Sequence, residues 1–380
     1  MAKRYYLFGH EGGPGADAFI SLWDTRNTST GSSNSDQIAI PTTATGSYAC
    51  TIDWGDSSTS AITAYNDAAL THTYTTAGEY TIIITGTFEG FQFDNTNDRL
   101  KVLNISQFGT LRISDGVIGK NYFYGCENVT CTATDVMDLS NADSILNGWR
   151  DCANWSYDYT GCDVSMIQSA ASAFLASGQT DPLPTSWPSL TTTFLMFAFS
   201  DFNGPVSITA PNLTTAQGMF QSSAMDSNVT LTALILSSVR AMFQSSPMSA
   251  NVTITSNNLS NAREMFNACF PMNGTLTIPT SNITTVFRFF QNADAWRQSL
   301  ASWTVPQITD FGSFMALATG MDSTDYGETL VSWAAQGFHA SARSISFGGS
   351  KYDSGDAAVV AARAVLVAHF TTLFEDGGPV

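Results

Sequence analysis

Cysteine and histidine, the residue types that most often bind metals or act in catalysis, are few and scattered in this sequence. No C-x-x-C pair occurs, and no cysteines and histidines have the spacing of a zinc site. We find no G-x-S-x-G turn, no H-E-x-x-H, no Walker loop and no G-x-G-x-x-G that follows a strand. We therefore expect no catalytic residue, no metal site and no cofactor. The residues concerned are Cys50, Cys126, Cys131, Cys152, Cys162, Cys269, His10, His72, His339 and His369.

Two short stretches have compositions like those of calcium-binding and phosphate-binding loops. DNTND, at residues 94–98, offers the oxygen ligands that Ca²⁺ prefers, but it lacks the spacing of an EF-hand loop. HEGGPG, at residues 10–15, is rich in glycine like a phosphate-binding loop, but it contains no lysine. A calcium ion at residues 94–98 is left open as an alternative, and phosphate binding is not expected.

The strongest signal in the sequence is a repeat. The pentapeptide MFQSS occurs at residues 219–223 and again 23 residues later, at residues 242–246. Large apolar residues continue this register in both directions at spacings of 23 to 26 residues. Such regular spacing indicates one repeating structural unit rather than a set of separate sites. The anchors are Phe123, Trp149, Phe174, Phe197, Phe220, Phe243, Phe266, Phe290 and Met315.

Other positions repeat in the same register. The residues seven, four and one before the anchors are mostly apolar, and the residue three after is always small. These offsets define one face of a helix, so we predict a short helical turn around each anchor. A short alternating strand follows, such as VTL at residues 229–231. One unit cannot bury its apolar face alone, so we expect the coils to stack into a leucine-rich-repeat-like solenoid in which each strand pairs with the next.

Several recurring residues follow from this stacking. Cys126, Cys152 and Cys269 fall in the small-residue column, where a buried thiol packs like serine or alanine. A disulfide between Cys126 and Cys152, on adjacent coils, is left open. The methionines that precede the anchors are expected to pack in the core rather than to bind a metal. The Asn-x-Ser/Thr sequences, for example at Asn212 and Asn228, recur with the repeat, so we interpret them as turn and strand residues rather than glycan acceptors.

Residues 36–115 alternate like the strands of a small antiparallel sandwich. Within them, DWGDSS (residues 53–58) and HTYTTAGEYTIIITG (residues 72–86) resemble the PKD-type immunoglobulin-like module, with Ser57 in place of the family's last glycine. The resemblance implies a non-catalytic spacer or adhesion module. Its structural residues would be Trp54 in the core, Asp56 as the cap of a tight turn, and His72 and Tyr74 at the neighbouring corner.

The repeat itself resembles the BspA-like family of leucine-rich-repeat surface proteins. NLTTAQGMFQSS (residues 212–223) and NLSNAREMFNAC (residues 258–269) carry this resemblance. It implies a non-enzymatic binding or adhesion role on a cell or particle surface, and it implies no particular ligand. A PKD-like module followed by BspA-like repeats is a combination associated with bacteriophage structural proteins.

Beyond Met315 the repeat fades. Residues 323–338 and 356–374 read as two amphipathic helices, which would cap the open end of the solenoid. We therefore predict a mainly β fold with short helices. It comprises an extended arm and linker (1–35), a PKD-like β-sandwich (36–115), a solenoid of about 23-residue coils (116–320) and a small α/β cap (321–380).

The charge balance excludes some classes of partner. The net charge of −17 argues against binding to nucleic acid or to an anionic membrane surface. No apolar run approaches the roughly 20 residues that span a bilayer, and the first residues do not form a convincing secretory signal. We therefore expect neither membrane insertion nor a nucleic-acid partner.

The leading hypothesis is a non-enzymatic bacteriophage virion protein, exposed on the particle as a capsid decoration, fibre or tail-associated protein. Its partners would be capsid or tail proteins bound through the N-terminal arm, further copies of itself, and a glycan or protein on the host surface. A bacterial cell-surface adhesin is one alternative. A polysaccharide-binding or -degrading spike is another, and it would need paired carboxylates on the solenoid face. Tryptophans for glycan binding would be Trp187, Trp296 and Trp303, although we expect these in the core.

Overall fold

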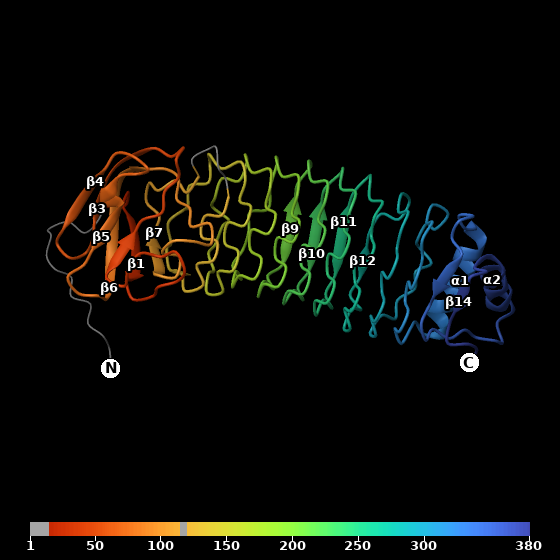
Figure 1. Ribbon diagram of the computed structural model, residues 1–380. Coiled ribbons are helices and arrows are strands. Elements are labelled where there is room, and N and C mark those ends of the chain that lie inside the picture. The colour runs from red at the N-terminus through yellow and green to blue at the C-terminus, as the bar shows by residue number, and fades with distance from the viewer. Residues whose placement is uncertain (1–14, 115–119) are drawn as a thin grey trace.

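The protein forms an elongated rod (Figure 1). The computed structural model describes residues 15–114 and 120–380. A β-sheet region lies at the N-terminal end, stacked coils form the middle, and two helices lie at the C-terminal end. One continuous apolar core runs from Phe19 to Phe370. The predicted fold class, mainly β with a solenoid and a small α/β end, is confirmed.

A six-stranded sheet forms the base of the N-terminal region, with the strand order β4-β3-β6-β1-β7-β8. All neighbours are antiparallel except β7 and β8. Alternate residues of β3 are buried, as its sequence pattern predicts. A separate pair, β2 and β5, forms a second small sheet, and η1 precedes β5. The bounds are β1 Phe19–Asp24, β2 Gln37–Ala39, β3 Tyr48–Asp53, β4 Thr59–Ile62, η1 Ala68–Leu70, β5 Thr71–Thr73, β6 Glu79–Phe88, β7 Val102–Gln107 and β8 Thr130–Cys131.

The predicted arm and linker is wrong for the part of it that the structure describes. Strand β1 lies inside the sheet, between β6 and β7, and it buries Phe19 and Trp23. Its sequence, FISLWD, has the apolar content of a strand, but glycine- and serine-rich flanks obscure it. Residues 1–14 lie outside the described residues, so docking through them stays a prediction.

A buried ion pair fixes the rest of the predicted linker to the sheet. The Lys101 ammonium lies 3.4 Å from the Asp98 carboxylate, and both side chains are fully buried. Lys101 donates to backbone oxygens in residues 33–37, and Asp98 accepts from the amides of Ser33 and Ala39. Burial lowers the pKa of Lys101, and the nearby carboxylate opposes that effect. The pair therefore holds this loop in one position.

Replacing one member of this pair tests its role. Lys101→Met leaves the Asp98 carboxylate buried without a counter-charge, and we expect a loss of about 3–5 kcal/mol in the free energy of unfolding. The double variant Lys101→Met/Asp98→Asn should lose less, because no charge stays buried. Urea unfolding measures both. A loss of only about 1 kcal/mol in the single variant, as for an exposed ion pair, would contradict the assignment.

The middle of the rod repeats with the predicted period. Seven successive parallel bridges join equivalent residues of neighbouring coils, from Ser144 to Asp310. Four coils also carry strands that pair in parallel and in register, with Val206, Val229 and Val252 side by side. The valines are buried and alternate with serine and threonine. The strands are β9 Val206–Thr209, β10 Val229–Thr232, β11 Val252–Thr255 and β12 Leu276–Thr277.

The segment around each anchor is not the helical turn that the side-chain spacing predicts. Leu195 and Phe199, two residues before and two after Phe197, have positive φ angles of 54° and 58°. Residues at the same two offsets have positive φ angles around all the other anchors. A left-handed residue at both offsets is incompatible with an α-helix, whose φ is about −63°. The segment is instead a series of overlapping tight turns.

Two alternating sets of backbone hydrogen bonds explain the helix-like spacing. The amides of Leu195, Phe197 and Phe199 donate to carbonyls of the next coil at 3.0, 2.8 and 2.9 Å. The amides of Met196 and Ala198, between them, donate to carbonyls three residues back. Each turn is closed by a hydrogen bond from an amide to the carbonyl three residues back. Side chains three or four positions apart therefore share the inner face, as they do on a helix.

This stacking already begins in the N-terminal region. The amides of Phe93 and Asn95 donate to the carbonyls of Tyr122 and Tyr124, in the same pattern as between later coils. The Phe93 ring also packs on Phe123. The predicted boundary at residue 115 therefore lies between coils that stack directly on each other.

The stacking also continues beyond Met315. The amide of Met315 donates to the carbonyl of Ser346, and that of Phe347 donates to Glu375. Phe347 is thus a further anchor, and the hydroxyl of Ser350 donates to its carbonyl oxygen. The two helices are insertions between these last coils. The elements here are α1 Ser323–Gln336, β13 Ser344–Ser346, α2 Ala357–His369 and β14 Leu373–Glu375.

One buried hydroxyl in the solenoid core is unpaired. Thr193 lies in a column that is otherwise apolar from Ile145 to Phe311, it is fully buried, and its hydroxyl has no hydrogen-bond partner among the described residues. Thr193→Val removes this unpaired group at nearly constant shape, so we expect the protein to gain about 1 kcal/mol in stability. The control is Thr255→Val, on the exposed face of β11. Thermal or urea unfolding measures both, and a less stable Thr193→Val variant would contradict the prediction.

Candidate functional site

The four PKD-like residues lie together at one corner of the N-terminal region. The Asp56 carboxylate is 2.8 Å from Nε2 of His72, and the His72 ring stacks on the indole of Trp54 with centroids 4.9 Å apart. The Tyr74 hydroxyl donates to the backbone carbonyl of Trp54. Trp54 is fully buried, and Asp56 accepts from the amide of Ser58 within the turn. We call Trp54, Asp56, His72 and Tyr74 the Trp54 corner.

Ser58 makes this corner look like a catalytic triad, but the geometry does not fit. In a triad the carboxylate and the serine bind opposite nitrogens of the imidazole. Here Asp56 and Ser58 both face Nε2 of His72, at 2.8 and 3.4 Å. The Ser58 hydroxyl donates to Asp56 at 2.5 Å. The nitrogen that would take the serine proton is already bound to the carboxylate, so this arrangement stabilises a turn.

The Trp54 corner should be sensitive to acid. Burial raises the pKa of Asp56, but hydrogen bonds from Ser58 and His72 outweigh burial and leave the pKa below its usual value. A depressed pKa stabilises the fold above the unfolded-state value of about 3.9, and this contribution is lost as pH falls through the folded-state value. Asp56→Asn should therefore cost about 1 kcal/mol at neutral pH, and the difference should shrink below about pH 4.

Urea unfolding at pH 7 and pH 3 measures this difference. Asp53→Asn is the matched control, because Asp53 accepts one backbone amide in the same turn, which an asparagine oxygen also accepts. A deficit of Asp56→Asn that is equal at both pH values would contradict the role assigned to its charge.

The repeated phenylalanines form a ladder along the rod. Phe197 and Phe220 stack with centroids 5.6 Å apart and planes within 4° of each other. Phe243, Phe266 and Phe290 continue the ladder at centroid distances of 5.5, 5.3 and 5.7 Å. All five rings are fully buried. They stabilise the stack and have no surface to offer a ligand.

The cysteines are not arranged for chemistry. All six are free, so Cys126 and Cys152 form no disulfide in the structure. Burial raises the pKa of both thiols, and the Cys152 thiol donates to the carbonyl of Phe123. Burial also raises the pKa of Cys162 to about 11. A raised pKa disfavours the nucleophilic thiolate, so these thiols act as small buried groups.

Asparagines of the repeat take part in stacking. The side-chain oxygen of Asn228 accepts the amide of Asn251, and that of Asn251 accepts the amide of Thr275. Asn212 donates its side-chain amide to the carbonyl of Pro188 in the previous coil. These side chains thus bridge coils, as the turn-and-strand interpretation predicts.

Both carboxylates of the loop at residues 94–98 already have partners within the chain. Asp98 is buried against Lys101, and Asp94 accepts from the side chain of Asn121 at 2.6 Å. Within residues 15–114 and 120–380, no three His, Cys, Asp or Glu side chains come close enough together to hold a metal ion.

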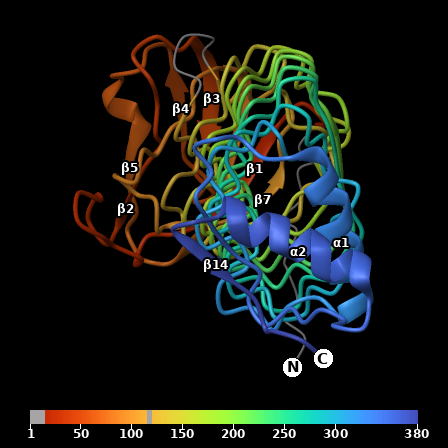
Figure 2. The ribbon, with the colours of Figure 1, turned by 90° about the vertical axis from the view of Figure 1, so that its right-hand side faces the viewer.

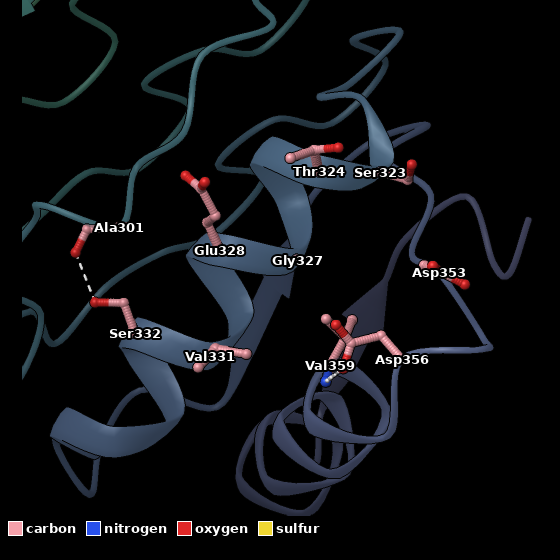
Figure 3. Close-up of a pocket in the computed structure, with 10 residues that line it drawn as sticks. All are labelled: Ala301, Ser323, Thr324, Gly327, Glu328, Val331, Ser332, Asp353, Asp356 and Val359. Carbon is pink, nitrogen blue, oxygen red and sulfur yellow. Dashed lines mark hydrogen bonds between the residues drawn. The ribbon is translucent and has the colours of Figure 1, made fainter.

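A groove lies between α1 and the start of α2 (Figure 3). Its volume is about 530 Å³, and its charged side chains are Glu328, Asp353 and Asp356. Asp356 is occupied as the N-cap of α2, and the Ser332 hydroxyl donates to the carbonyl of Ala301 at 2.6 Å. The ten lining residues include no histidine, cysteine, lysine or arginine. The groove is therefore acidic, and two of its polar side chains already have partners within the chain.

The alternative of a polysaccharide-degrading spike needs paired carboxylates. Among the described residues, burial raises the pKa of the carboxyl groups of Asp151 and Asp325. Asp151 belongs to the Trp149 coil and Asp325 to α1, at the far end of the rod, so these two do not pair. The nearby carboxylates of Asp322 and Glu328 also raise the pKa of Asp325. The candidate tryptophans for glycan stacking are buried. These are Trp187, Trp296 and Trp303, at most 5% exposed.

Comparison with protein-family models, curated proteins and solved structures finds no match for this chain. The PKD-like and BspA-like resemblances therefore rest on their sequence motifs alone. In the described part of the chain, no helix has the length and apolar content needed to cross a membrane.

Sequence reasoning missed Ser58 at the Trp54 corner and the anchors Phe93 and Phe347. The signal for Phe347 was present, because F-x-x-S at residues 347–350 repeats F-x-x-S at residues 220–223. It was overlooked because the inserted helices lengthen the spacing beyond the period. Ser58 carries no such signal, since its contact with His72 depends on the fold.

Proposed function

We propose that this chain is a non-enzymatic structural protein on the surface of a bacteriophage virion: a capsid decoration, fibre or tail-associated protein. It acts in attachment and recognition, or in stabilising the particle, through non-covalent contacts. The observation that carries the proposal is the stack of coils that runs from the β-sheet region to α2. The residues that repeat from coil to coil form the core of the stack, so the loops and the two ends are the surfaces available to partners.

Within this proposal, the chain combines a PKD-like module with BspA-like repeats. The PKD-like assignment is supported by the W-G-D turn and the H-x-Y corner, whose side chains contact one another. The BspA-like assignment is supported by the period of about 23 residues and by the N-L-T/S…M-F segments. Both kinds of module are used on cell or particle surfaces.

The recognition surface is expected in the loops where the coils differ. The buried positions of the turn segments carry similar residue types in every coil, and they have no surface to offer a ligand. Leu234 and Ile235 are neighbouring exposed residues of one loop, and Phe270 is exposed in another. Exposed apolar side chains that lie near each other often mark an interaction surface. A host glycan or protein is the expected ligand there.

Binding to particles tests the proposal. Deleting residues 2–14 leaves every described residue in place, whereas deletion up to residue 35 would remove β1. Purified full chain should co-sediment with particles that lack the protein, and the deletion variant should not. Both should unfold at the same temperature. Phe270→Ala is the control, which should bind particles like the full chain.

The two parts of the proposal fail separately. If the full chain does not co-sediment with particles and is recovered with bacterial envelopes, the virion assignment is wrong and the adhesin alternative gains support. If the deletion variant binds as well as the full chain, docking through residues 2–14 is wrong.

A further inference from the structure

Helix α2 presents an outer face that consists entirely of alanine and valine. Eight of its thirteen residues are exposed, and none of the eight is polar. The amphipathic pattern predicted for this helix is therefore wrong on its outer side. The face of a helix that is exposed to solvent normally carries polar and charged residues. The exposed residues, which we call the α2 outer face, are Ala357, Ala358, Val360, Ala361, Ala364, Val365, Val367 and Ala368.

The inner side of α2 already holds the helix in place. Val359, Ala362 and Leu366 are buried against the rest of the chain. Arg363 forms a bidentate ion pair with Asp376, at 2.7 and 3.0 Å. The outer face is therefore not needed to dock α2 on its own chain, and its composition calls for another explanation.

The outer face has the spacing of a helix–helix seam. Its alanines at positions 357, 361, 364 and 368 are separated by four, three and four residues. This is the spacing of the contact positions in a coiled coil. Alanine at these positions lets a second helix approach closely, at the short end of the usual 8–10 Å between axes. Val360 and Val367 flank this seam and lie about two helical turns apart.

We propose that the α2 outer face binds the same face of a second copy of this chain. With a net charge of −17 per chain, two copies repel each other when charged surfaces meet. The α2 outer face carries no charge, so two copies that meet there bring fewer like charges together than two copies that meet through a charged surface. A two-fold pair needs a patch that complements itself, and a uniform seam of alanine and valine does so when two helices run antiparallel.

The position of α2 makes this contact accessible. Viewed from the C-terminal end, α2 crosses the foreground, outside the coils (Figure 2). Six of the fifteen exposed large apolar residues in the described part of the chain lie in residues 331–380. Two rods joined through α2 would meet at their C-terminal ends, with their N-terminal ends free. This inference stands whether or not the virion proposal is correct.

The contact should be of modest strength. A helix of 13 residues is about 20 Å long, so the patch is smaller than the standard interface of about 1,600 Å². We therefore expect a reversible dimer that depends on concentration. Salt should strengthen the dimer. The Debye length, over which charges act on each other, falls from about 10 Å at 0.1 M salt to about 3 Å at 1 M, and this weakens the repulsion between the two acidic chains.

Sedimentation equilibrium of the full chain over a range of concentrations tests the proposal. Ala364→Arg places a charge at the centre of the seam, and we expect it to weaken the dimer at least about tenfold, because an unpaired charge would be buried. Thr230→Arg, on the exposed face of β10, adds the same charge elsewhere and should leave the dimer unchanged. Circular dichroism checks that both variants fold.

Each outcome decides the proposal. Dimerisation of the full chain that increases with salt and is lost only in Ala364→Arg supports it. A full chain that stays monomeric at every concentration and salt level overturns it and leaves the α2 outer face to a different protein. A dimer that Ala364→Arg does not weaken also overturns it, because the contact must then lie on another face.

Discussion

Hydrogen bonds between the turn segments of neighbouring coils constrain most of this structure. Alternate amides around each anchor donate to the next coil, and this requires left-handed residues such as Leu195 and Phe199 at two positions per coil. Such a conformation costs a residue other than glycine roughly 1–2 kcal/mol. The cost is offset because these amides would otherwise be buried without partners. The backbone geometry is thus held by the stack, and a single coil would not keep it.

The side chains of the repeat follow from that constraint. Coils bonded at fixed spacing place equivalent residues directly above each other, so Phe220 stacks on Phe243 in nearly parallel planes. The serines at the position three after an anchor face that anchor's own carbonyl, whereas the thiols of Cys152 and Cys269 donate to the anchor carbonyl of the previous coil. Ser223 and Ser246 donate their hydroxyls to their own anchor's carbonyl at 2.9 and 2.8 Å. A larger residue would not fit there, which explains why serine, alanine and cysteine exchange in this column.

A stack built from like coils has two ends and a set of loops that need not repeat, and these are the places left for function. At one end, the coils merge with the β-sheet region that contains the Trp54 corner. At the other, α1 and α2 are inserted between the last coils, and α2 leaves an apolar outer face. The buried ladder and the free thiols contribute stability, while the loops and ends supply the surface that a partner would meet.

The period, the core columns and most of the strands, including β6 and β9–β12, could be predicted from the sequence. Burial and strand alternation determine which residue types occur at which spacing, so both can be recognised directly in the sequence. The sequence also pointed to Trp54, Asp56, His72 and Tyr74 through motifs that resemble the PKD-type module. It did not reveal the place of β1 in the sheet, the contact between Lys101 and residues 33–39, or the turns around the anchors.

Only the tertiary structure decided those features, because they depend on contacts between residues far apart in the chain. The spacing around Phe197 is the same for an α-helix and for a chain of tight turns, since both bring side chains three and four positions apart to one face. What distinguishes them is where the amides of Leu195, Phe197 and Phe199 donate, and their acceptors lie in the next coil. Residue types record which side chains are buried, but they do not record the partners of backbone hydrogen bonds.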